Sequence, residues 1–165
     1  MHNLKKINNE VYFTNNKELN FINKSHIKFL KSKVKKAKKK RARICLHKSI
    51  KDKLHEMFII LSKETYIRPH KHLNKAESLH VIEGSADVIF FNDYGEVVKK
   101  VRLSKKENFY YRLSNSAYHT FKIRTKNLIF HETTEGPFIK NKTCYAKWAP
   151  NEKNIEKGKK YINSL

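Results

Sequence analysis

Strand-like runs follow one another between residues 55 and 133, and no helical period separates them. Apolar side chains recur at every second position, and short polar turns such as Asn92-Asp93-Tyr94-Gly95 join neighbouring runs. Many short strands without intervening helices predict antiparallel sheets packed as a sandwich or barrel, so the expected fold class is all-β. The expected strands are 55–62, 66–72, 77–83, 86–92, 96–103, 108–113, 117–124 and 127–133.

A set of apolar side chains on these strands is expected to fill the interior. Its members lie at alternate positions, so they share the inward face of each strand. They are Met57, Ile59, Leu61, Leu79, Val81, Phe121, Ile123, Leu128 and Phe130.

A helical pattern precedes the strands. Apolar residues recur at spacings of three and four at Ile27, Leu30, Val34 and Ala37. This period predicts an amphipathic helix over 26–39 with Ser25 as its N-cap.

The length of 165 residues suits one domain with an appendage. We expect an N-terminal arm and helix over 1–40, a barrel over 41–150 and a Lys-rich tail over 151–165. The first 22 residues are expected to pack on the domain as an arm or short strand, and the last fifteen to be mobile.

A group of histidines and a carboxylate has the spacing of metal ligands. His70 and His72 lie two residues apart, so their imidazoles share one strand face, about 7 Å apart along the backbone. If the next strand folds back beside them, Glu77 joins the pair, and His119 on a later strand is the best candidate for a fourth ligand. Two neutral imidazoles and a carboxylate suit Fe, Mn, Ni or Zn, so the sequence predicts a site for a divalent transition metal.

A polar row follows the predicted helix. Arg41, Arg43, Cys45 and His47 lie on one face and alternate with apolar residues, and two interpretations remain open. The row faces water, or it lines a barrel cavity and binds an anionic substrate. Arg68, two residues before His70, is a further candidate for substrate binding. Glu132 shares a face with Leu128 and Phe130 and is expected to point into the cavity, where a buried carboxylate needs a partner such as Arg43.

The metal-ligand stretch resembles the first cupin motif in His70-x-His72, Glu77 and Gly84, and His119 stands where the second motif has its histidine. Ser114 and Ser116 replace the usual Pro and Gly of that second motif. A wider resemblance is to the WbuC family of cupin-fold metalloproteins. It is carried by Arg41-x-Arg43-x-Cys45-x-His47, Tyr66-Ile67-Arg68-Pro69-His70-Lys71-His72, Tyr118-His119 and His131-Glu132 with Gly136-Pro137-Phe138.

The resemblance implies a cupin jelly-roll barrel with an N-terminal helical extension, a bound metal, and an association with bacterial surface polysaccharide (O-antigen) synthesis. The leading hypothesis is a metal-dependent enzyme of isomerase, epimerase or oxygenase type acting on a small sugar-derived substrate. Its candidate bases are Glu132, His47, Tyr66 and Tyr111. A non-catalytic metal-dependent module that binds or senses a sugar is the alternative.

The net charge of +22 would ordinarily indicate an anionic macromolecule as partner. Only six of the 37 basic residues are Arg, however, and the Lys residues are spread along a chain rich in Asn and Ile, as codon bias in an A+T-rich genome would produce. Nucleic acid is therefore a minor alternative as partner, and homodimer formation is left open. Without an apolar leader or a membrane-length segment, the expected location is the cytoplasm, with no membrane partner.

Overall fold

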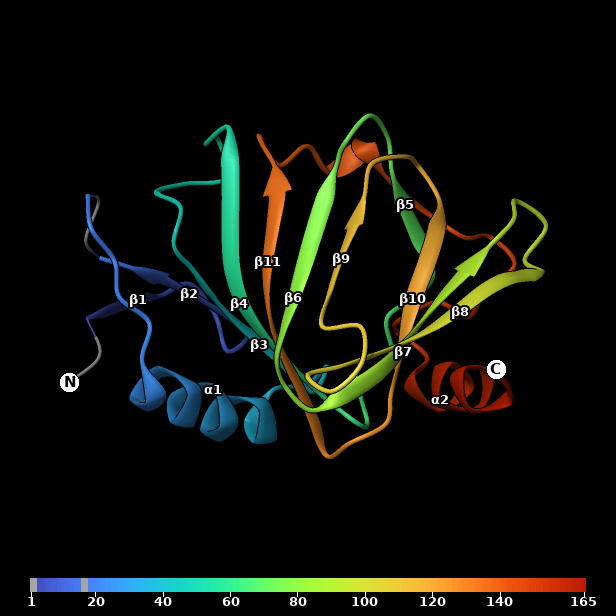
Figure 1. Ribbon diagram of the computed structural model, residues 1–165, viewed down its shortest axis with the longest axis horizontal. Coiled ribbons are helices and arrows are strands. Elements are labelled where there is room, and N and C mark those ends of the chain that lie inside the picture. Colours follow the sequence, from blue (N-terminus) through green and yellow to red (C-terminus); the bar gives the residue numbers. More distant parts are fainter. Residues whose placement is uncertain (1–2, 16–17) are drawn as a thin grey trace.

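The computed structural model describes residues 3–15 and 18–165 and consists mainly of two facing β-sheets with a helix at each side (Figure 1). The larger sheet has the strand order β1-β2-β3-β4-β11-β6-β9, and the smaller sheet has the order β12-β5-β10-β7-β8. The larger sheet comprises β1 (Leu4–Lys6), β2 (Val11–Thr14), β3 (Arg41–Cys45), β4 (Leu54–Ser62), β6 (Glu77–Glu83), β9 (Tyr110–Leu113) and β11 (Asn127–Glu135). The smaller comprises β5 (His70–His72), β7 (Ser85–Phe91), β8 (Val97–Ser104), β10 (Tyr118–Ile123) and β12 (Thr143–Tyr145). The helices are α1 (Lys24–Lys36), η1 (Lys140–Lys142) and α2 (Ile155–Ser164).

The predicted strands between 55 and 133 are present in the expected order. Most ends agree to within two residues, but the run 66–72 forms a strand only at His70–His72. Pro69 has no N–H to give to a sheet ladder, so the residues before it cannot pair as a regular strand.

The interior between the sheets is filled by side chains from both of them. All nine residues predicted for this interior belong to one buried cluster, which Cys45, Ala86, Val88 and Leu103 complete. Alternation along each strand places these residues inward, which confirms the interior predicted from the period of two.

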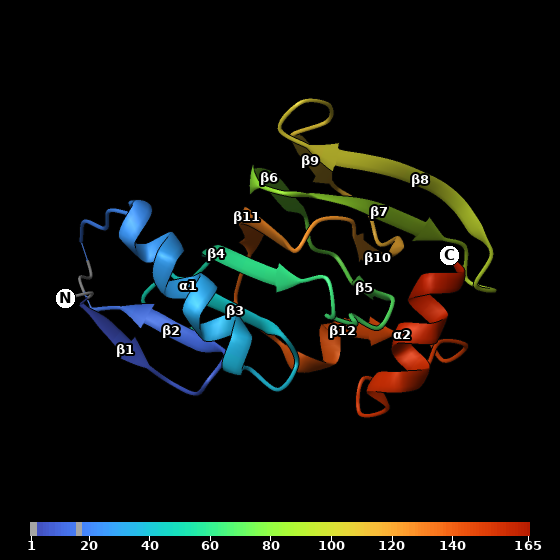
Figure 2. The same ribbon diagram turned by 90° about the horizontal axis from the view of Figure 1, so that it is seen from below.

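Strand β3 is covered on both faces, which the sequence pattern alone did not predict. Ala42 and Ile44 pack in a second buried cluster with Leu30 and Val34 of α1. The helix therefore covers the outer face of the larger sheet, as Figure 2 shows. Consequently the opposite face of β3, which carries Arg43 and Cys45, is directed at the interior.

Helix α1 begins two residues earlier than predicted. Its N-cap is Asn23, whose side chain accepts hydrogen bonds from the backbone N–H groups of Ser25 and His26, 3.0 and 3.4 Å away. Ser25 is thus inside the helix, and the prediction of Ser25 as the cap is wrong. Asn is as good a cap as Ser, so residue type could not separate the two.

The N-terminal segment contains strands as well as a helix. Within the described residues, β1 and β2 form a hairpin and β2 pairs in parallel with β3, so this arm extends the larger sheet. The first helix follows only at Lys24, so a purely helical extension is not what precedes the barrel.

The C-terminal segment is docked, contrary to the expectation of a mobile tail. Helix α2 is capped by Asn154, whose side chain accepts from the Lys157 N–H at 3.0 Å. Gly158 lies so close to the Tyr66 ring that an added Cβ would be 2.2 Å from it. The Lys content of the tail suggested solvation, but its Gly and Ile162 bury one face of the helix.

The turn between β6 and β7 requires a glycine. Gly84 has φ of +86°, and a Cβ there would lie 2.1 Å from the backbone oxygen of Asn127. This turn therefore packs directly against the start of β11.

Among the helices formed by residues 3–15 and 18–165, none has the length and apolar character needed to cross a membrane.

Replacing Leu30 with Ala should destabilise the protein by about 2 to 4 kcal/mol, because it removes a fully buried side chain between α1 and the sheet. Urea unfolding monitored by circular dichroism measures the change. Lys28→Ala, on the exposed face of the same helix, should change stability by less than about 0.5 kcal/mol. Equal effects of the two substitutions would show that α1 does not pack as described.

Candidate metal centre

The four predicted metal ligands meet between the two sheets. His70 and His119 are direct cross-strand partners on β5 and β10 of the smaller sheet, and His72 follows on β5. Their ring centroids are 4.8 Å apart for His70 and His119, 5.0 Å for His70 and His72, and 6.2 Å for His72 and His119. Glu77 reaches the same place from β6 of the larger sheet. The expectation that this strand folds back beside the one with His70 and His72 is wrong, because β5 and β6 belong to different sheets.

Each imidazole is oriented by a contact at its Nδ1 atom. Nδ1 of His70 lies 3.0 Å from the Arg68 carbonyl, and Nδ1 of His119 lies 3.0 Å from the Ala117 carbonyl. Nδ1 of His72 is 3.2 Å from the Thr143 hydroxyl. A carbonyl only accepts, so the first two rings carry a proton on Nδ1 and offer Nε2 to the interior. Outer contacts of this kind accompany metal-binding histidines.

Glu77 lies between two of the imidazoles and is buried. Its Oε1 is 3.0 Å from Nε2 of His119, and its Oε2 is 3.6 Å from Nε2 of His72. The Tyr111 hydroxyl donates to Oε1 at 3.3 Å. Thus one carboxylate is held by groups from both sheets.

The charge states of these groups follow from their surroundings. Burial, together with the two neighbouring imidazoles, lowers the pKa of His70 to about 3, and burial also lowers the pKa of His72. Burial opposes a charged His119, but the Glu77 carboxylate outweighs it and raises the pKa of His119. Burial likewise opposes ionisation of Glu77, yet the imidazoles lower its pKa to about 2. The site therefore holds two neutral imidazoles and an anionic carboxylate.

By residue type, this set of donors suits a divalent transition metal. Donor atoms on one ion at about 2.1 Å are roughly 3.0 to 3.4 Å apart, close to the two Glu77–His separations. Among the described residues, no group of three or more His, Cys, Asp or Glu side chains is arranged so that it could hold a metal ion as it stands. Glu77 instead hydrogen-bonds His119 directly, so a bound cation would displace the proton from Nε2 of that ring.

Glu132 and Arg43 occupy the interior beside this cluster. Glu132 on β11 pairs with Met57 and Leu79, which are both interior residues, so its side chain shares their face. Burial and the nearby Glu77 raise the pKa of Glu132 to about 7, and the Arg43 guanidinium opposes this rise. Of the two interpretations of the polar row, the structure therefore places Arg43 toward the cavity.

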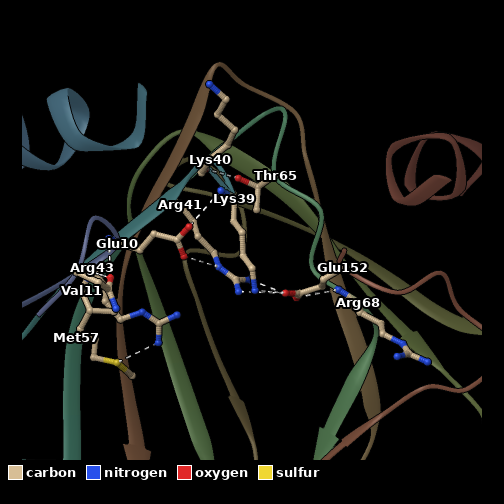
Figure 3. A network of polar contacts seen from close by, with 11 residues as sticks. Glu10, Val11, Lys39, Lys40, Arg41, Arg43, Met57, Thr65, Arg68 and Glu152 are labelled. Carbon is tan, nitrogen blue, oxygen red and sulfur yellow. Dashed lines mark hydrogen bonds and ion pairs between the residues drawn. The ribbon is translucent and has the colours of Figure 1, made fainter. Parts of the chain in front are cut away.

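Two of the predicted substrate-binding arginines are already engaged elsewhere. Figure 3 shows Arg41 and Lys39 reaching Glu152 in the C-terminal segment, with N–O distances of 3.2 and 2.9 Å. Arg41 also lies 3.7 Å from Glu10, and Nε of Arg68 donates to the Ala146 carbonyl at 2.9 Å. These contacts connect the N-terminal hairpin, β3 and the C-terminal segment.

Arg43 differs from Arg41 in its partners. Its Nη1 lies 3.7 Å from the Met57 sulfur, and no described carboxylate forms an ion pair with it (Figure 3). An inward arginine without a carboxylate partner remains available to an anionic ligand.

His47 and Tyr66, two of the candidate bases, have other surroundings. His47 stacks on His55 with ring centroids 4.1 Å apart, and its Nδ1 accepts from the Glu56 N–H at 3.3 Å. The Tyr66 hydroxyl donates to the Pro150 carbonyl at 2.8 Å, and burial raises its pKa. Tyr66 therefore anchors the C-terminal segment. Of the four candidate bases, Glu132 and Tyr111 lie beside the candidate metal centre formed by His70, His72, His119 and Glu77.

Sequence reasoning missed Thr143 and Lys75. Thr143 orients His72 only because β12 pairs with β5, and no local pattern predicts that pairing. Lys75 lies in the polar connection after His72, and its ammonium group weakly opposes the rise in the pKa of Glu132 that burial causes. The position of Lys75 between the two strands that carry the predicted ligands was the sequence feature that could have identified it.

The comparisons with known proteins support the fold. A family model described as a domain of unknown function, DUF6016, matches residues 22–103. No curated protein matches the chain. A crystal structure of CapF with the inhibitor 3-isopropenyl-tropolone is similar, with 14% identity, a TM-score of 0.53, and coverage of 62% of this chain and 31% of CapF. The capsular polysaccharide assembling protein CapF from Staphylococcus aureus matches at 14% identity and a TM-score of 0.54, with coverage of 62% and 28%.

The chain thus spans about a third of the length of CapF. At this identity the likeness concerns the fold alone. Together with the two facing sheets it shows a mainly β fold of two sheets.

Replacing Glu152 with Gln should destabilise the protein at pH 7 by about 2 kcal/mol, as expected for hydrogen bonds to a charged group. Burial opposes the charge of Glu152, but Arg41 and Lys39 outweigh it and lower its pKa. The stabilisation is therefore present above the unfolded pKa of about 4.3 and is lost as the pH falls through the folded pKa.

Urea unfolding at pH 7 and at pH 3 measures this dependence. Glu156→Gln, at a carboxylate that is 81% exposed, is the matched control and should have little effect at either pH. A difference between wild type and Glu152→Gln that stays constant down to pH 3 would contradict the assignment.

Proposed function

We propose that this chain is a cupin metalloprotein that acts as a metal-dependent enzyme on a small, anionic or sugar-derived substrate. His70, His72, His119 and Glu77 would hold a divalent transition metal, and Glu132 would act as the base. Arg43 would bind the anionic group of the substrate.

One observation carries the proposal. Three imidazoles, fixed at Nδ1 by oxygens, surround a buried carboxylate whose two oxygens lie 3.0 and 3.6 Å from Nε2 atoms. Structural zinc sites are closed by four ligands, commonly cysteines, whereas mixed His and carboxylate sets accompany catalytic metals. Cys45, the buried thiol of β3, packs among the apolar interior residues and is not part of the set.

A metal at this site would supply a Lewis acid that polarises a carbonyl or hydroxyl oxygen of the substrate. Glu132 can accept a proton near neutral pH, because burial and Glu77 raise its pKa to about 7. The Tyr111 hydroxyl donates to Glu77 and orients that carboxylate. The Arg43 guanidinium can pair with a carboxylate or phosphate of the substrate in a two-pronged contact.

The sugar-derived substrate is proposed from two resemblances. The sequence resembles the WbuC family, which implies O-antigen synthesis, and the fold resembles CapF, described as a capsular polysaccharide assembling protein. Isomerase or epimerase chemistry suits this context, since proton transfer next to a polarised carbonyl needs a base such as Glu132. A module that binds the sugar without converting it would use the same metal and Arg43.

Replacing His119 with Ala should weaken metal binding at least about 100-fold, because loss of an outer-sphere partner alone typically costs 10- to 100-fold. Elemental analysis of untagged protein, followed by titration of the apo-protein with Zn and Fe(II), measures the change. His80→Ala is the control, because His80 is exposed on β6 and should leave metal binding unchanged. Wild-type protein that binds no transition metal would refute the proposed metal centre.

Replacing Glu132 with Gln should leave metal content intact and lower turnover of nucleotide-sugars by about 100-fold or more, the usual contribution of a general base. Arg43→Ala should instead weaken ligand binding with metal content intact. Assays of the metal-loaded protein with a panel of nucleotide-sugars, alongside calorimetric binding, separate the two effects. Tight binding without turnover by wild-type protein would favour the non-catalytic module.

A further inference from the structure

A pocket of about 1040 Å³ lies away from the metal cluster. It is bordered by α1, by the β6–β7 turn and by the loops before β5 and β11. Glu83 lines it at the last residue of β6, whereas Glu77 of the metal cluster is the first residue. Six residues of strand separate the two sites by about 20 Å, so they occupy opposite ends of the barrel.

The wall of this pocket is held together by backbone contacts between loops. The Lys63 N–H donates to the Lys126 carbonyl at 3.0 Å, which joins the loops before β5 and β11. The Ser85 N–H donates to the Thr125 hydroxyl at 2.9 Å, and the Arg124 N–H donates to the Ser85 carbonyl at 2.9 Å. Three segments distant in sequence therefore form one continuous surface.

Cations are concentrated on this surface. Six of its thirteen lining residues are Lys or Arg, against 37 of 165 in the whole chain, and two are Glu. The six are Lys31, Lys35, Lys40, Lys63, Arg124 and Lys126. The fold thus brings six of the 37 basic residues to this surface.

Some of these cations are already paired. Lys31 lies 2.7 Å from Glu83, and Arg124 pairs with Asp87. The ammonium groups of Lys35, Lys63 and Lys126 form no ion pair with any described residue, and they come from three different segments. Three unpaired charges around one pocket favour an anionic occupant.

We propose that this pocket, the basic pocket, binds the phosphate backbone of nucleic acid without reading its sequence. Lysine ammonium groups contact phosphates as point charges. Duplex DNA has about one charge per 1.7 Å of its axis, so each phosphate that a lysine neutralises releases condensed counterions. No aromatic residue lines the pocket, so base stacking contributes nothing to the contact. The proposal is independent of the metal centre at the other end of the barrel.

The test measures binding of a fluorescein-labelled DNA duplex of about 20 base pairs by anisotropy over a range of salt concentrations. The triple variant Lys35→Gln, Lys63→Gln, Lys126→Gln removes the three unpaired charges. The matched control is Lys99→Gln, Lys105→Gln, Lys106→Gln, which removes three exposed charges from β8 and the turn after it. Both variants lower the net charge equally, and melting temperatures close to that of wild type verify their folding.

In the basic-pocket variant the slope of log K against log salt, which is negative, should become less steep by about 2 to 3, or about 0.9 per lost phosphate contact. Its binding should also weaken more than about tenfold at 0.1 M salt. The control should weaken binding less than about threefold. If the triple variant does not fold, Lys126→Gln alone should make the slope less steep by about 0.9.

Equal losses in the two variants would overturn the proposal, because the overall charge would then explain binding. Absence of wild-type binding at 0.1 M salt would also overturn it. A strong preference among duplex sequences would contradict the backbone contact. Heparin that binds as tightly as DNA, with the same dependence on the three lysines, would show a site for anionic polymers in general and reject nucleic acid as its specific partner.

Discussion

The contact between Glu77 and His119 joins the two sheets at the place where the chemistry is proposed. The carboxylate belongs to the larger sheet and the imidazole to the smaller, and both are buried. A buried carboxylate is costly unless it is paired, so each partner requires the other in position. The three histidines, the Tyr111 hydroxyl and Glu132 are arranged around this contact. The contact between Glu77 and His119 therefore both joins the sheets at this end of the barrel and sets the geometry of the candidate metal centre.

Much of the interior could be predicted from the sequence because it depends on local periodicity. Alternation along β4, β6, β10 and β11 identified the inward side chains without knowledge of the pairing. His70, His72 and Glu77 lie within eight residues of one another, but β5 and β6 belong to opposite sheets, so Glu77 meets the imidazoles across the interior. His119 was identified as the best candidate on a later strand and by its place in the second cupin motif, whereas the pairing of β10 with β5 was not predicted.

The remaining features depend on contacts between distant segments. The sequence leaves the direction of the Arg43 side chain open, because the packing of α1 on the opposite face of β3 decides it. The docking of the C-terminal segment depends on contacts between distant residues: the Tyr66 hydroxyl donates to the Pro150 carbonyl, and the Arg68 N–H donates to Glu152. The composition of the tail indicates solvation and could not predict these contacts. The basic pocket combines a helix with three loops, and an even spread of Lys in the sequence could not predict where those side chains gather.

The tight turn at Gly84 follows the end of β6 opposite to Glu77. Its Cα faces the Asn127 carbonyl so closely that any side chain would push β6 and β11 apart at this end. The same two strands carry Glu77 and Glu132 toward the other end, and their ladder is continuous between Phe130–Val81 and Thr134–Glu77. A register shift between Ile129 and Phe130 separates this turn from that ladder, so the close approach that Gly84 permits is followed by a change of pairing before the strands reach the two acidic groups.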